Sequence, residues 1–298
     1  MTESKDVPDP PKFTEADWRK CRESRDYRPM LFEWYKFVGL LCSFFSRIRP
    51  DSPAVRSIPP VHYSVLIGLL NRCSRLMCAN LTLSHGGLFG ETTALIDRCI
   101  FESYVKIAWL CQGNTAERFV QFLADGLKTE LELKAKIKTN IQSRGGEILK
   151  IEKRMLASID RHIASSGLNE SEIDSTKKLP DLAAMIEGLG LDRLMYIVGQ
   201  RIGSHHVHGT WPSLRFHYLK ENEEGILCPR DHDCPTHVNQ YVLVTMIVLN
   251  AMKSFVHFIS REGTDIAHLL GLVKAIEEEI EKLNKEIIGN DFERAEEI

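Results

Sequence analysis

The sequence has almost no alternation of apolar and polar residues of the kind that β-strands require. Its regular patterns follow the helical period, and no repeat of fixed length recurs along the chain. A formal net charge of -3 over 298 residues excludes a broad electrostatic attraction to nucleic acid or to anionic membranes. The sequence therefore predicts an all-α protein, in which any contact with RNA is confined to a small site.

The chain also lacks the short motifs of common catalytic and nucleotide-binding sites. Its glycine pairs, Gly86-Gly87 and Gly145-Gly146, have neither the strand-to-helix setting nor the lysine of a phosphate loop. No Ser-His-Asp arrangement and no paired acidic motif stands out from chance. We therefore expect no cofactor, and we assign both glycine pairs to breaks between helices.

The eight cysteines show no disulfide framework, because most of them lie inside apolar helical stretches. Four residues in one polar stretch offer the nitrogen and sulfur ligands that zinc uses: Cys228, His232, Cys234 and His237. Five residues separate the two cysteines, which is wider than the usual zinc patterns. We favour a polar loop without a metal here, and a zinc site is the alternative.

The N-terminal residues do not resemble a targeting signal. The first residues lack the apolar core of a secretory signal and the basic amphipathic character of a transit peptide, so we expect a cytoplasmic protein. The most apolar segment, residues 241–259, contains Asn250, Lys253 and His257. These polar residues favour a buried helix over a membrane span.

Composition divides the chain into three parts. Residues 1–28 are rich in proline and poor in large apolar residues, which predicts a mobile lead with one short helix near residues 16–23. Residues 29–262 are expected to form a helical bundle. Highly charged helices with a thin apolar stripe predict a protruding arm within it, at about residues 115–165.

Residues 263–298 are expected to form a C-terminal helix. Its apolar positions follow a spacing of four, three and four residues: Ile276, Ile280, Leu283 and Ile287. This stripe is about two heptads long, so it either docks on the body of the protein or pairs two subunits in a dimer.

The stretch from residue 191 to residue 211 is the best candidate for a site. It begins as an amphipathic helix with Leu194, Ile197, Val198 and Ile202 on one face, and Arg201 lies at the rim of that face. Gly203 and Ser204 are expected to weaken the helix. Three histidines follow: His205, His206 and His208. A cation and titratable imidazoles thus share one helix end, where they would suit acid-base chemistry on a phosphate.

A second candidate lies on the expected helix over residues 91–111. Arg98 and Glu102 are four residues apart, so they can pair on one helix face, and Glu91 lies on nearly the same side. The simplest interpretation is an ion pair that braces the bundle. The alternative is a supporting role, in which Glu102 orients Arg201 or a histidine.

Two blocks of this sequence resemble a bacterial family known only as a domain of unknown function. In the first block, Arg98 and Glu102 take the places of the family's Arg and its Glu four residues on. The second block contains the remaining matched positions: Leu179-Pro180-Asp181, Gly190-Leu191, Arg201, Ser204, Val207 and His208. The resemblance covers about residues 60–260.

That family in turn resembles the HEPN superfamily, which implies a helical bundle, frequent dimerisation and metal-independent cleavage of RNA. Active members carry an Arg followed by a His, with four to six residues between them. Arg201 has this spacing to His206 and to His208. Many active members have a polar residue directly after the Arg, where this chain has Ile202. Three other pairs share the spacing outside that context: Arg56 with His62, Arg230 with His237, and Arg261 with His268.

The resemblance therefore implies a HEPN-like endoribonuclease or toxin component of phage defence or stress response. In that interpretation Arg201, His208 and His206 are catalytic, Arg98, Glu102 and Ser204 support them, and no metal takes part. RNA is then the expected substrate, and the protein is expected to act as a homodimer. The alternative is a catalytically silent helical module that binds a protein or nucleic-acid partner. In that case Arg201 pairs with Glu102 or Glu91, and His208 caps a helix.

Overall fold

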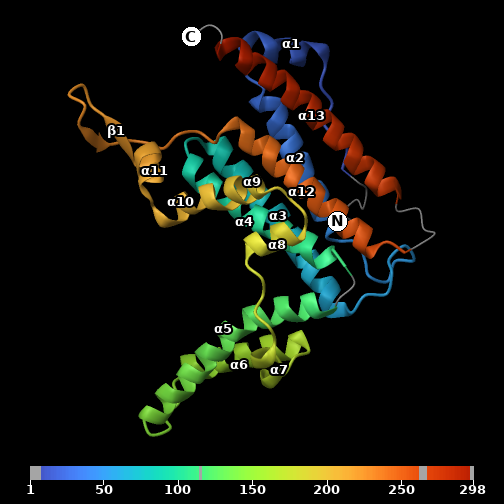
Figure 1. Ribbon diagram of the computed structural model, residues 1–298, viewed down its shortest axis with the longest axis vertical. Coiled ribbons are helices and arrows are strands. Elements are labelled where there is room, and N and C mark those ends of the chain that lie inside the picture. The colour runs from blue at the N-terminus through green and yellow to red at the C-terminus, as the bar shows by residue number, and fades with distance from the viewer. Residues whose placement is uncertain (1–7, 114–115, 262–266, 296–298) are drawn as a thin grey trace. The chain divides into compact units, whose positions relative to one another are not determined.

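The computed structural model describes residues 8–113, 116–261 and 267–295, and helices account for most of them (Figure 1). The all-α prediction is confirmed. The chain divides into two compact units. Unit 1 comprises residues 1–58, 66–112 and 182–298, and unit 2 comprises residues 59–65 and 113–181.

Unit 1 contains the longest apolar helices and the candidate site. Its larger helices are α1 (Glu15–Ser24), α2 (Arg28–Phe45), most of α3 (Pro60–Gly86), α4 (Gly90–Cys111), α12 (Val238–Ile259) and α13 (Ala267–Ala295). Its shorter elements are α8 (Leu182–Gly188), α9 (Arg193–Tyr196), the π-helix η1 (Ile197–Ile202), α10 (Gly203–His208), α11 (Trp211–Ser213), the π-helix η2 (Leu214–Tyr218), and strands β1 (Leu219–Glu221) and β2 (Leu227–Pro229).

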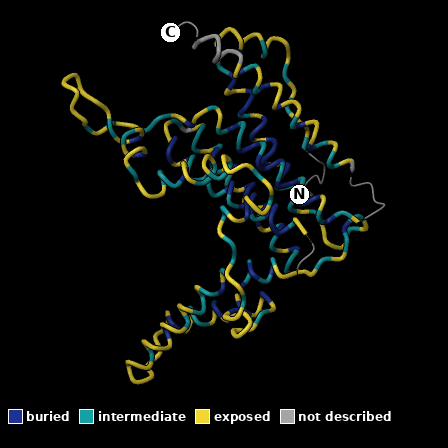
Figure 2. Tube along the Cα trace, viewed as in Figure 1, coloured by how far each residue is buried: buried dark blue, intermediate teal, exposed yellow. Residues whose placement is uncertain are grey.

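Helix α12 lies at the centre of unit 1, where it packs against α4, α2 and α13. Figure 2 shows the buried residues concentrated in the central helices of unit 1. By length and composition α12 is able to cross a membrane, but 61% of its apolar window is buried inside the protein. Its polar residues have partners: Lys253 pairs with Glu277 of α13 at 2.6 Å, and Asn250 donates to the Met246 carbonyl. These contacts agree with the buried helix that the sequence predicts.

The apolar stripe of α13 is used within the chain. Ile276, Ile280, Leu283 and Ile287 are all buried, and α13 contacts α12 and α2. Of the two alternatives for this stripe, docking on the body is therefore the one observed. Residues 262–266, where the expected boundary of the C-terminal helix falls, lie outside the described residues.

The expected lead contains one well-capped helix. Helix α1 begins after Thr14, whose side chain accepts from the Asp17 backbone while the Asp17 carboxylate accepts from the Thr14 backbone. Cys21 and Tyr27 are buried. Residues 1–7 of this segment lie outside the described residues.

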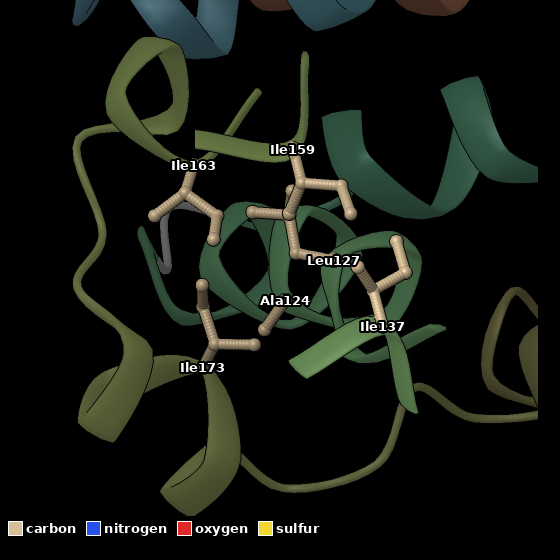
Figure 3. Close-up of a cluster of buried hydrophobic side chains, with 6 residues drawn as sticks. All are labelled: Ala124, Leu127, Ile137, Ile159, Ile163 and Ile173. Atoms are coloured by element: carbon tan, nitrogen blue, oxygen red, sulfur yellow. The ribbon is translucent and has the colours of Figure 1, made fainter. Parts of the chain in front are cut away.

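Unit 2 has its own small core. It consists of α5 (Ala116–Ser143), α6 (Lys150–Ser166) and α7 (Glu170–Ser175), together with the first residues of α3. Six buried side chains from α5, α6 and α7 form its centre (Figure 3): Ala124, Leu127, Ile137, Ile159, Ile163 and Ile173. Gly145 and Gly146 separate α5 from α6 with φ angles of 71° and 93°, as the sequence predicts.

Two short elements were missed by the sequence-based prediction. No helix was predicted where α7 lies, and the signal for it is the capping box formed by Asn169 and Glu172. Strands β1 and β2 form an antiparallel hairpin in an expected loop. Its turn uses the Asn222 side chain, which accepts from the Ile226 backbone, and Gly225 with a φ of 76°. Strands this short are too brief to show an alternating pattern.

Candidate functional site

Two glycines bring the candidate segment close to α4. A Cβ on Gly199 would lie 2.7 Å from the Phe101 ring, and a Cβ on Gly203 would lie 3.1 Å from the Arg98 Cβ. Gly203 and Ser204 were expected to weaken the helix, but they do not end it. The backbone continues through η1 and α10 to His208, and the helix stops at Gly209, which has a φ of 55°. Gly199 and Gly203 allow close packing, and Gly209 ends the helix.

The apolar face of this segment points away from the core. Leu194 is 60% exposed and Ile202 is 49% exposed, because the glycine side of η1 and α10 faces α4 instead. Large apolar side chains continue over α11 and η2, with Trp211 and Phe216 each 59% exposed. We call this the exposed apolar surface, and its members are Leu194, Ile197, Val198, Ile202, Val207, Trp211, Phe216 and Tyr218. Such a surface is typical of an interaction site.

Arg201 and His208 are exposed beside that surface. Among the described residues, neither side chain has a hydrogen bond or an ion pair. The expected pairing of Arg201 with Glu102 or Glu91 is not formed, because both carboxylates bind other groups. His208 is the last residue of α10 and leaves its imidazole in solvent.

Arg98, Glu102 and Ser204 form the support beneath Arg201. The Arg98 Nε lies 3.4 Å from the Glu102 Oε1, so the predicted ion pair is present. The Glu102 Oε1 also accepts from the Gln200 Nε2 at 3.1 Å, and the Ser204 hydroxyl donates to the Gln200 carbonyl at 2.9 Å. Glu102 therefore holds the residue before Arg201, and it does not hold Arg201 itself.

His206 differs from Arg201 and His208 because most of its side chain lies inside the protein. Its ring points into unit 1, its Nδ1 lies 3.9 Å from the Glu91 Oε1, and only 15% of the side chain is exposed. Burial, together with the neighbouring His217, lowers the pKa of His206. The candidate catalytic trio is thus split into an exposed pair and one interior histidine.

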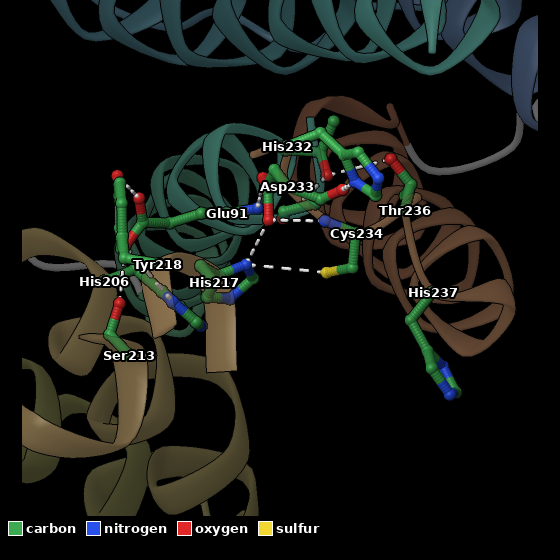
Figure 4. A network of polar contacts seen from close by, with 12 residues as sticks. Glu91, His206, Ser213, His217, Tyr218, His232, Asp233, Cys234, Thr236 and His237 are labelled. Atoms are coloured by element: carbon green, nitrogen blue, oxygen red, sulfur yellow. Dashed lines mark hydrogen bonds and ion pairs between the residues drawn. The ribbon is translucent and has the colours of Figure 1, made fainter. Parts of the chain in front are cut away.

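Glu91 is the centre of a polar network that the sequence-based prediction missed (Figure 4). It is buried and accepts hydrogen bonds from the Ser213 hydroxyl at 2.5 Å and from the Tyr218 hydroxyl. The hydrogen bond to Glu91 raises the pKa of Tyr218. More than 120 residues separate Glu91 from Ser213 in sequence, so no local spacing predicts this contact.

A second network joins η2 to the loop before α12. The His217 Nδ1 lies 2.5 Å from the Asp233 Oδ1 and 3.5 Å from the Cys234 Sγ. The Asp233 Oδ2 accepts from the Glu91 backbone at 2.9 Å, so the loop also caps the first turn of α4. Hydrogen bonds from the Glu91 backbone and from His217 lower the pKa of Asp233 even though burial opposes that shift.

The four residues considered for zinc from the sequence do not converge. Only Cys234 belongs to the network above. The Cys228 thiol donates to the Lys220 carbonyl in the hairpin, the His232 ring lies against the Asp233 carbonyl, and the His237 ring accepts from the Asn239 backbone at the start of α12.

A cavity of about 290 Å³ lies between α4, η1 with α10, and α12. Asp97, Arg98 and His206 line it together with apolar side chains such as Phe101 and Leu243. The Asp97 Oδ1 accepts from the Asn80 Nδ2, whereas no described residue forms a hydrogen bond with its buried Oδ2. Burial raises the pKa of Asp97 well above its ordinary value of 3.8, so the fold favours the protonated form of this carboxyl.

Asp97→Asn should therefore make the fold more stable at pH 7 than the wild type. The unfolded chain ionises Asp97 above about pH 3.8, whereas burial in the folded chain disfavours the ionised carboxyl, so Asp97 lowers the stability of the wild type as pH rises from there. Urea denaturation between pH 3.5 and 8 measures the difference, which should shrink at the acid end. The control is Asp174→Asn at an exposed position. Identical pH dependence of Asp97→Asn and wild type would show that the carboxyl is not held neutral.

Comparison with known proteins identifies the family. The sequence model of a family of unknown function (DUF5677) matches residues 63–226, which is more than half of the chain. The match includes α4, η1 and α10, and with them Arg98, Glu102, Arg201 and His208. A search of curated proteins and a search of solved structures each found no match. The chain belongs to this family of unknown function.

Proposed function

We propose that this chain is a HEPN-like, metal-independent endoribonuclease or toxin component that works as a homodimer in the cytoplasm. The observation that carries the proposal is the exposure of Arg201 and His208 without partners, on one continuous helical segment. An unpaired guanidinium and an accessible imidazole are groups that can support RNA cleavage without a metal. The resemblance to the HEPN superfamily supplies the reaction and a role in phage defence or stress response.

In the proposed step, His208 removes the proton from a ribose 2′-hydroxyl. The 2′ oxygen forms a bond to phosphorus while the bond from phosphorus to the 5′ oxygen breaks, and the leaving 5′ oxygen takes a proton from water. Arg201 binds the phosphate oxygens as negative charge builds on them. The products are a 2′,3′-cyclic phosphate and a 5′-hydroxyl. We give His206 no part in this proposed step, because its side chain is only 15% exposed and its Nδ1 lies 3.9 Å from the Glu91 Oε1.

The exposed apolar surface supports a partner at this site. Trp211, Phe216 and their neighbours lie on the elements that directly follow Arg201 and His208. A second copy of this chain would cover them and place two Arg201–His208 pairs near each other. Cleavage of RNA by purified wild type, and its loss in Arg201→Ala and His208→Ala variants, tests the proposal.

The same surface favours a second candidate, a catalytically silent module that binds a protein partner. Apolar side chains at this density make an interface whether or not chemistry takes place beside them. The two candidates differ in one measurement. A protein that cleaves no RNA, but changes its oligomeric state when Trp211 and Phe216 are replaced by serine, would be an interaction module.

Unit 2 offers a feature that suits an anionic partner. Four exposed cations lie on one face of α6, spaced by helical turns: Lys150, Lys153, Arg154 and Arg161. Among the described residues none of the four has an ion pair. By contrast, Lys134 of α5 and Arg144 of the loop after α5 each form ion pairs with carboxylates. We propose that this basic face of α6 binds the phosphate backbone of RNA.

Replacing Lys153 and Arg154 by glutamate should weaken RNA binding about tenfold or more near 0.1 M salt, because two phosphate contacts are lost. The slope of log affinity against log salt should fall by about 1.4 for a single strand. Fluorescence anisotropy with a labelled RNA, measured at several salt concentrations, checks both. The control replaces Lys136 and Lys138 by glutamate; both are exposed on α5 and carry the same charge as Lys153 and Arg154. An equal loss in the control would assign the effect to net charge alone.

A further inference from the structure

We propose that His217, Asp233 and Cys234 form a zinc site. Their ligand atoms, the His217 Nδ1, an Asp233 carboxylate oxygen and the Cys234 Sγ, all lie within 4.8 Å of one another. Two segments supply them, η2 and the loop before α12, and Figure 4 shows the three side chains pointing toward one another. The site is separate from Arg201 and His208 and is independent of the proposed RNA cleavage.

The distances fit a tetrahedral ion after a small adjustment. Zinc bonds of about 2.0–2.3 Å place neighbouring ligand atoms roughly 3.3–3.8 Å apart. The His217 Nδ1 and the Cys234 Sγ are 3.5 Å apart, which is within that range. The His217 Nδ1 and the Asp233 Oδ1 are 2.5 Å apart, the separation of a hydrogen bond. Zinc would replace the proton that these two atoms share, and the carboxylate would move outward by roughly 1 Å.

The arrangement argues against a nucleophilic thiol. In a thiol-imidazole-carboxylate relay, the imidazole uses one ring nitrogen for the nucleophile and the other for the acid. Here the Cys234 Sγ and the Asp233 Oδ1 both face the same nitrogen, the His217 Nδ1. Three donor atoms of different residues that converge on one point are the geometry of a cation site. Thiolate, imidazole and carboxylate together are ligands that zinc accepts.

The surrounding structure holds the three ligands in place. The His217 side chain is only 4% exposed, and the Asp233 carboxylate accepts from the backbone of Glu91 and of Cys234. Gly90 makes room for the sulfur, because a Cβ there would lie 2.7 Å from the Cys234 Sγ. The Gly90 backbone also donates to the Cys234 carbonyl at 2.9 Å. Contacts of this kind orient metal ligands and are needed for tight binding.

Three protein ligands leave one coordination position of the ion for water or for a group from outside. Among the described residues, no fourth histidine, cysteine or acid joins the set. The ion would fasten the loop before α12 to η2 and to the first turn of α4. The rings of His206 and His217 lie 5.0 Å apart, so the interior end of the candidate segment would be held as well.

The test measures zinc and cobalt in the full-length protein. Wild type is loaded with zinc, desalted and analysed by mass spectrometry for metal content; we expect about one zinc per chain. Cobalt loading should produce the near-ultraviolet charge-transfer band of a thiolate ligand. Cys234→Ala and His217→Ala should lose both signals, whereas the matched controls Cys228→Ser and His232→Ala from the same stretch should keep them.

Three results would overturn the proposal. The first is that the wild type binds far less than one zinc per chain. The second is that the cobalt-loaded wild type shows no thiolate band, and the third is that the Cys234→Ala variant retains its zinc. The first two use only the natural sequence, so they decide the question even when a variant fails to fold. Circular dichroism of each variant identifies that case.

Discussion

Replacing both Arg201 and His208 by alanine is expected to lower RNA cleavage at least about 100-fold. Removing the imidazole takes away the general base, and such groups contribute about 10²–10⁴-fold to a reaction rate. Removing the guanidinium takes away the cation that meets the charge on phosphorus. Because both side chains are exposed and unpaired among the described residues, the double variant should fold like wild type. The measurement is the initial rate on labelled RNAs of several sequences, with circular dichroism to verify folding.

The control for this experiment is the pair Arg261 and His268. It has the same spacing of seven positions, and both residues are exposed, but it lies outside the segment that faces α4. Alanine at both positions should leave the rate within about twofold of wild type, as is usual for surface substitutions. A wild type that cleaves no RNA, or a double variant as fast as wild type, would remove the ribonuclease proposal. It would leave the interaction module as the better account.

Gly199→Val should destabilise unit 1 by about 2–3 kcal/mol, since an added side chain must displace a packed ring. The first carbon of that side chain would already lie 2.7 Å from three atoms of the Phe101 ring, which is buried in the core. Neither η1 nor α4 can yield without losing its packing against the other. Urea denaturation gives the free energy of unfolding, and hydrogen exchange over residues 191–218 shows whether the segment detaches from α4.

Gly68→Val is the matched substitution. Gly68 is also in a helix, but it is exposed and a Cβ there would meet nothing within 4 Å. The change should alter stability by less than about 0.5 kcal/mol, because the helix propensities of glycine and valine differ little. Equal effects at the two positions would mean that η1 does not pack closely on α4.

The direction in which Leu194, Ile197, Val198 and Ile202 point was beyond prediction from the sequence. A helical period identifies an apolar face but does not say what covers it. Here Gly199 and Gly203 permit a closer approach on the other side, and the π-helix shifts the register of the side chains. Gly203 was expected to weaken the helix, because its use as a contact point depends on Arg98 in a distant helix.

The ion pair of Arg98 with Glu102 was predictable, whereas the network around Glu91 was not. A spacing of four residues on one helix brings two side chains together wherever the helix lies. Ser213, Tyr218 and His206 reach Glu91 only because η2 and α10 fold back over the start of α4. Likewise, the sequence offers Cys234 as a zinc ligand, but His217 and Asp233 join it only in three dimensions.

The sequence by itself determined the helical class, most of the long helices, the buried position of α12 and the segment that carries Arg201 and His208. Each of these follows from local pattern, because apolar periodicity, glycine breaks and capping residues act over a few turns of one helix. Tertiary structure alone decided which face of that segment is exposed, that His206 is interior while His208 is not, and which side chains meet at Glu91 and at His217. Those outcomes depend on contacts between residues far apart in the chain, whose packing energy outweighs local preference.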